Sequence, residues 1–149
     1  MKVLGINRAE LLVEDSDAAE ATFKLLFNGA NFSPDLGVHN RPLDCRTDHA
    51  IGLELVHPKD ETDKIGQLMK AKGQHVFTVV YDVESIDDAR EHLKKNGFEI
   101  QYEGDYSAKP EVDVHKQIVV RPDRTHGMLV VFQERRLKGL SVHESRGRG

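Results

Sequence analysis

One structural unit occurs twice in this chain, and the repeat limits its possible folds more than any other feature. In each half, a strand-like segment leads into a helix that an Asn-Gly pair ends. Residues 9–13 precede the helix that ends near Gly29, and residues 76–81 precede the helix that ends near Gly97. The two Asn-Gly pairs lie 68 residues apart. That spacing is too long for a solenoid unit, so it indicates duplication of a whole module.

Both expected helices carry a start signal and an apolar stripe. Asp15, Ser16 or Asp17 can cap the first helix and Ser85 can cap the second, because each offers a side-chain oxygen to the first backbone N–H groups. Apolar residues then recur at helical spacing. They are Ala18, Ala21 and Leu25 in the first half and Ile86, Ala89 and Leu93 in the second.

Short strand candidates follow each helix. They span residues 30–34, 43–48, 51–57, 98–103, 114–121 and 128–133. The pattern predicts an α+β fold of two tandem βαβββ modules, residues 1–57 and 75–133, with a mixed sheet rather than a doubly wound parallel one. Between them, Ile65 and Leu68 at helical spacing predict a linker helix within residues 58–74, capped by Asp60 or Thr62.

Composition narrows the classes of function. The chain has 149 residues and a formal net charge of −4, which argues against a general nucleic-acid binder. No apolar run reaches the roughly 18 residues of a membrane span, and the first residues lack the pattern of a signal peptide. Cys45 is the sole cysteine, so no internal disulfide can form. We therefore expect a cytoplasmic protein whose partner is a small molecule, not nucleic acid or a membrane.

The C-terminal segment, residues 134–149, differs from the rest of the chain in charge. Five basic residues against two glutamates give it a charge of +3. They are Arg135, Arg136, Lys138, Arg146 and Arg148 against Glu134 and Glu144. Glycine and serine near the end add to this polar character, so the composition predicts a flexible tail.

Three segments in a fixed order resemble the vicinal oxygen chelate superfamily, which contains glyoxalases, bleomycin-resistance proteins and extradiol dioxygenases. Residues 6–15 look like the opening strand of that family and residues 52–58 look like its fourth strand. Residues 65–82 are similar to the branch of methylmalonyl-CoA epimerase. The resemblance implies a cupped sheet with helices on the outside, a central small-molecule cavity and a homodimer.

The resemblance also implies a metal site with one ligand on each of four strands. In this chain the four positions fall on Arg8, Glu54, His75 and Val131. Neither a guanidinium nor an alkyl side chain ligates a cation. Because strand side chains alternate faces, Glu10 is expected to join Arg8 in the cavity.

Three hypotheses compete for the cluster of Arg8, Glu10, Glu54 and His75. In the first it is a metal-free catalytic site of an isomerase, epimerase or lyase, in which Arg8 stabilises an enolate and one of the other three moves a proton. In the second, Glu54, His75 and Glu10 hold a divalent metal. In the third, the cavity only binds or sequesters a ligand, as in the bleomycin-resistance-like members, or the cluster is a structural ion-pair network.

We predict no tightly bound ion at the four-ligand position. Arg8 and Val131 occupy two ligand places, and the guanidinium repels a cation by several kcal/mol where screening is poor. Elemental analysis of protein purified without chelator measures this. Near-stoichiometric zinc, nickel, cobalt or manganese that disappears in His75→Ala would contradict the prediction.

Overall fold

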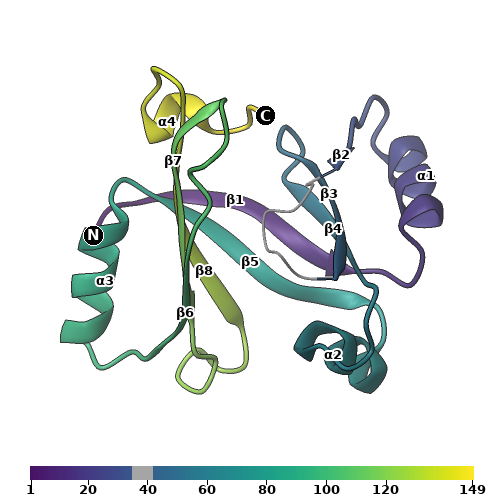
Figure 1. Ribbon diagram of the computed structural model, residues 1–149, viewed down its shortest axis with the longest axis horizontal. Coiled ribbons are helices and arrows are strands. Elements are labelled where there is room, and N and C mark those ends of the chain that lie inside the picture. Colours follow the sequence, from purple (N-terminus) through teal and green to yellow (C-terminus); the bar gives the residue numbers. More distant parts are fainter. Residues whose placement is uncertain (35–41) are drawn as a thin grey trace.

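The computed structural model describes residues 1–34 and 42–149, and these form a curled mixed sheet with helices around it (Figure 1). The strands are β1 (Val3–Leu12), β2 (Ser33–Pro34), β3 (Leu43–Asp48), β4 (Leu53–Pro58), β5 (His75–Val83), β6 (Ile100–Asp105), β7 (Val112–Val120) and β8 (Leu129–Leu137). The helices are α1 (Ser16–Leu26), α2 (Lys64–Lys72), α3 (Ile86–Lys95) and α4 (Val142–Ser145). No helix among the described residues is long and apolar enough to cross a membrane.

The strand order shows the duplication directly. It reads β2-β3-β4-β1-β5-β8-β7-β6, with β1 parallel to β4 in one module and β5 parallel to β8 in the other. The two modules join through the antiparallel pair β1 and β5, which runs through the middle of the molecule, while β2–β4 and β6–β8 rise on either side (Figure 1). The predicted α+β fold of two tandem βαβββ modules is confirmed.

Local signals set the helix starts. The Asp15 side chain accepts a hydrogen bond from the Ala18 N–H, and Ser85 accepts one from the Asp88 N–H, so both predicted caps are confirmed. The predicted linker helix is present as α2, but its cap is Asp63, one residue after Thr62 and three after Asp60, so both predicted caps were wrong. Asp60 cannot cap it, because its carboxylate instead accepts from the backbone and hydroxyl of Thr62 in a turn.

Alternation along the strands separates the apolar core from the concave face. Leu55 of β4 packs in the core cluster that includes α1, and Val130 of β8 packs in the cluster that includes α3. Their neighbours Glu54 and Val131 therefore point to the other face, where both line one cavity. Helices α1 and α3 thus cover the outside of the sheet, whereas α2 borders the concave face, where its Ile65 lines the same cavity.

The C-terminal segment packs on the body, which corrects the prediction of a flexible tail from residue 134. Strand β8 continues to Leu137, and Ser141 with Glu144 forms a capping box that starts α4. Val142 is only 4% exposed. Arg146 reaches the sheet, where its Nε lies 3.1 Å from Asp82 Oδ2. Because the segment is polar in composition, no helix was predicted there, although α4 forms and buries Val142.

We expect Val142→Ala to lower the free energy of unfolding by about 2 kcal/mol, because it deletes two buried methyl groups and leaves a small cavity. Urea unfolding followed by circular dichroism measures the change. Val76→Ala is the matched control, since the same two methyl groups there are largely exposed on β5. Equal losses in the two variants would mean that α4 does not pack on the body.

Candidate active site

The centre of the concave face is the side chain of Arg8, which is 4% exposed. Its Nε donates to Glu54 Oε2 at 2.6 Å, and its Nη2 donates to Glu10 Oε1 at 3.0 Å. The parallel pairing of β1 with β4 places Glu10 opposite Glu54, so both carboxylates reach the same guanidinium. A buried charge is stable only when paired in this way. Three of the four residues predicted for the site therefore lie together.

The fourth, His75, is not brought into this cluster. The pairing of β1 with β5 shifts register between Glu10 and Leu11, which leaves Phe77 as an extra residue and sets Thr78 opposite Glu10. His75 lies farther along, opposite Leu12, with its Nδ1 2.8 Å from the Gly73 carbonyl oxygen. It lines neither of the two cavities of the concave face. His75 is therefore separated from the cluster by the register of β1 against β5, which sets Thr78, three residues later in the chain, opposite Glu10.

The second module contributes polar groups that the sequence analysis missed. Gln133 Oε1 on β8 accepts from Arg8 Nη1 at 3.1 Å and from Gln117 Nε2 at 2.9 Å. His115 Nε2 lies 3.1 Å from the same oxygen. Burial, together with the cations of Arg8 and Arg135, lowers the pKa of His115 to about 3, so its ring is neutral. The sequence did contain a signal for these residues, because they are polar side chains within strands that are otherwise largely apolar.

Two cavities open on the cluster. The larger, which we call the chamber, has a volume of about 470 Å³, and Glu10, Glu54, Thr78 and Gln117 are among its polar lining. Its apolar lining is Leu43, Cys45, Val56, Ile65, Phe77, Tyr102, Tyr106, Val119, Leu129 and Val131. This combination of apolar walls and a few converging polar groups is typical of a small-molecule site.

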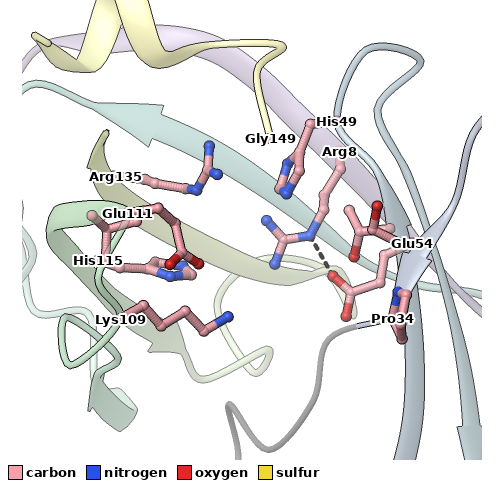
Figure 2. A pocket seen from close by; sticks show the side chains of 12 residues that line it. Arg8, Pro34, His49, Glu54, Lys109, Glu111, His115, Arg135 and Gly149 are labelled. Carbon is pink, nitrogen blue, oxygen red and sulfur yellow. Dashed lines mark hydrogen bonds and ion pairs between the residues drawn. The ribbon is translucent and has the colours of Figure 1, made fainter. Parts of the chain in front are cut away.

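The smaller cavity has a volume of about 120 Å³, and its lining holds cations together with the carboxylates of Glu54 and Glu111 (Figure 2). Lys109, His115 and Arg135 from the second module face Arg8 and His49 from the first. Burial and the charges of Arg135 and Arg8 lower the pKa of His49 to about 3. Arg8 lines this cavity, Glu10 lines the chamber, and Glu54 lines both.

The carboxyl of Glu10 has an altered proton affinity. Burial raises its pKa from 4.5 to about 7, the negative charge of Glu54 raises it too, and Arg8 opposes the rise. The Glu10 side chain retains 16% of its exposure and borders the chamber. A carboxylate with a pKa near neutrality can both accept and return a proton at physiological pH.

Thr78 adds a hydrogen-bonding group beside that carboxyl. Its Oγ1 is buried and makes no well-formed hydrogen bond within residues 1–34 and 42–149, but it is near enough to the Glu10 carboxyl to help lower that group's pKa. It lines the chamber opposite Glu10 on β5. A buried hydroxyl gains from a strong partner, so a ligand oxygen in the chamber would be a favourable acceptor for it.

The residues present do not fit a metal. In the part of the chain that the structure describes, no three His, Cys, Asp or Glu side chains gather in a way that could hold an ion. Arg8 occupies the place between Glu10 and Glu54, and its positive charge neutralises the carboxylates that would otherwise attract a cation. No chemical step is therefore assigned to a metal.

Comparison with solved structures identifies the fold. No protein-family model and no curated protein matches the sequence. A variant of Streptomyces coelicolor methylmalonyl-CoA epimerase, in complex with 2-nitronate-propionyl-CoA, matches with a TM-score of 0.71 and 15% identity over 89% of this chain and 97% of that one. Methylmalonyl-CoA epimerase from Mycobacterium tuberculosis matches with a TM-score of 0.70 and 16% identity over 89% and 88%.

The chain shares the fold of these methylmalonyl-CoA epimerases over most of its length. Among its structural neighbours are methylmalonyl-CoA epimerases, as the resemblance of residues 65–82 implies. At 15–16% identity the likeness describes the fold, and the chemistry of the site has to be argued from this chain's own residues.

The charges around Glu10 predict how its titration responds to mutation. We expect a midpoint near pH 7 for Glu10, a lower midpoint in Glu54→Gln because a negative neighbour is lost, and a higher one in Arg8→Gln because the opposing cation is lost. Carboxyl ¹³C NMR of glutamate-labelled protein, assigned with Glu10→Gln, measures these midpoints. A midpoint near 4.5 in the unsubstituted protein, or shifts of the same sign in both variants, would contradict the prediction.

Proposed function

We propose that this protein is an isomerase or epimerase that removes and returns a proton next to the carbonyl group of a small molecule, without a metal. The observation that carries the proposal is Glu10, a carboxyl with a pKa of about 7 at the wall of a chamber of about 470 Å³. A lyase that starts from the same enolate is the related alternative. The fold neighbours, which are epimerases, support the isomerase class.

The proposed reaction needs one base and one stabilised oxygen. The Glu10 carboxylate takes the proton from the carbon, and the electron pair of that C–H bond moves through the carbonyl group onto its oxygen, which gives an enolate. The planar enolate then turns its other face to Glu10 within the chamber, and return of the proton from Glu10 to the same carbon inverts its configuration. Because the pKa of Glu10 is near 7, both the proton transfer and its reversal are accessible at neutral pH.

Two groups stabilise the developing negative charge in this proposal. The guanidinium of Arg8 is 3.0 Å from the Glu10 carboxylate and supplies a fixed positive charge beside the reaction. The Thr78 hydroxyl borders the chamber and can donate to the enolate oxygen. Glu54 keeps Arg8 in place through the 2.6 Å contact to its Nε. We assign no role in the reaction to His75, which lies outside the cluster.

The chamber limits the class of substrate. Its walls are mostly apolar, so the molecule that enters it has an apolar part next to an enolisable carbonyl group. Acyl thioesters are the first candidates, because the Streptomyces coelicolor neighbour holds 2-nitronate-propionyl-CoA. The resemblance also leads us to expect a homodimer in the cytoplasm, and both remain part of the proposal.

A non-catalytic binding protein of the same fold is the second candidate. Phe77, Tyr102 and Tyr106 line the chamber, although the chain has only three tyrosines and six phenylalanines. Aromatic side chains contribute large contact areas to bound ligands, as a sequestering pocket requires. Three aromatic side chains at one cavity are a large share of so small a supply, and this concentration favours the binding alternative.

The two candidates differ in solvent exchange. We expect the protein to catalyse deuterium incorporation next to the carbonyl of an acyl thioester in deuterated water, beginning with methylmalonyl-CoA, and Glu10→Gln to slow it about a hundredfold or more. Proton NMR follows the exchange. Glu91→Gln is the control, since Glu91 is exposed on α3. Full activity in a variant with Glu10, Glu54 and His75 all changed to Gln would rule out the mechanism and favour the binding protein.

A further inference from the structure

The carboxylate of Asp82, on β5, is 1% exposed and connects the C-terminal segment to the site. Three donors reach it. Arg146 Nε lies 3.1 Å and Asn7 Nδ2 3.1 Å from Oδ2, while Gln133 Nε2 lies 3.2 Å from Oδ1. Asp82 belongs neither to the cluster around Arg8 nor to the lining of either cavity. Its burial with three donors therefore indicates a supporting role rather than contact with a ligand.

The chemistry of the carboxylate fixes the orientation of both amides. An ionised carboxylate only accepts hydrogen bonds, so Asn7 and Gln133 must each turn their NH₂ group toward Asp82. Their carbonyl oxygens then point the other way, and both accept from Arg8 Nη1, at 3.0 Å for Asn7 and 3.1 Å for Gln133. The same guanidinium nitrogen is thus held by two acceptors whose direction Asp82 determines.

Arg146, in the C-terminal segment, connects this hydrogen-bond network to the backbone of β1. Besides Asp82, it donates to the backbone oxygens of Leu4 at 2.9 Å and Ile6 at 3.1 Å, directly before Arg8 in β1. Gly5 between them makes room, since a Cβ there would lie 2.8 Å from Arg146 Nη2. The Arg146 side chain is 31% exposed, so the ion pair itself is screened, and its contribution is geometric more than electrostatic.

We propose that Arg146 and Asp82 are positioning residues, which hold the Arg8 guanidinium against Glu10 and Glu54 through Asn7 and Gln133. The segment that carries α4 is then a structural part of the active site, although it contributes no group to the reaction. The consequence for catalysis rests on the proposed function. The positioning itself does not, and it can be measured on the protein without substrate.

The direct readout is the mobility of Arg8. We expect Arg146→Gln to accelerate solvent exchange of the Arg8 Nε–H about tenfold or more, because a loosened guanidinium loses its protected hydrogen bond to Glu54. ¹⁵N NMR of the full chain measures the rate, with the resonance assigned by its loss in Arg8→Lys. The titration midpoint of Glu10 should rise in the same variant, because the cation that opposes its protonation moves away.

Matched variants separate positioning from a general loss of stability. Arg148→Gln removes the same charge two residues later, where the side chain is exposed, and should leave the Arg8 exchange rate unchanged. Asp82→Asn keeps the size of the side chain but no longer dictates how the two amides turn, so it should accelerate the exchange as Arg146→Gln does.

The proposal is overturned if Arg146→Gln and Asp82→Asn both leave the Arg8 exchange rate and the Glu10 midpoint unchanged, even where the melting temperature falls. It is equally overturned if Arg148→Gln accelerates the exchange as much as Arg146→Gln. If Arg146→Gln does not fold, Asp82→Asn decides alone. Activity does not enter these outcomes, so a failure of the proposed reaction and a failure of the positioning network can be told apart.

Discussion

Burial of the Arg8 guanidinium is the constraint on which the rest of the site depends. A charge removed from water is tolerated only with partners of opposite charge and with acceptors for its N–H groups. Glu10 and Glu54 come from the first module, and Gln133 comes from the second. The second acceptor of Arg8 Nη1, Gln133, is therefore in place only when the two halves of the sheet lie against each other.

Burial, together with the balance of charges around it, explains the raised pKa of Glu10. Arg8 neutralises one carboxylate, and Glu54, which is nearly fully buried, takes the 2.6 Å contact. Glu10 is then the surplus negative group in a place that disfavours charge, and binding a proton restores balance. Its pKa is higher in the folded than in the unfolded chain. The resulting stability is complete at low pH and is lost as pH rises through about 7.

The fold and part of the site could be predicted from the sequence, but from different kinds of signal. Helix caps such as Asp15 and Ser85 and the repeated strand pattern are local signals, so they predicted both modules. Glu10 and Glu54 followed from strand alternation and the resemblance. His75 was misplaced because periodicity within a strand does not specify its register against a neighbour, and that register sets Thr78 opposite Glu10. The C-terminal helix also has a local signal, the capping box of Ser141 and Glu144. It was not predicted because the expectation for that segment was based on composition alone.

The two modules have similar folds but contribute different chemical groups to the site. The concave ends of β1 and β4 hold the charged groups, while β5 and β8 hold Thr78, Val131 and the amide of Gln133. The metal site that the resemblance implies would take ligands from both modules, whereas one cation and two carboxylates lie within the first. At the chamber, the second module supplies neutral polar groups and apolar wall. The proposed reaction needs Glu10 ionised, which is the form that folding disfavours. The second module and Arg146 keep Arg8 beside it and so limit that cost.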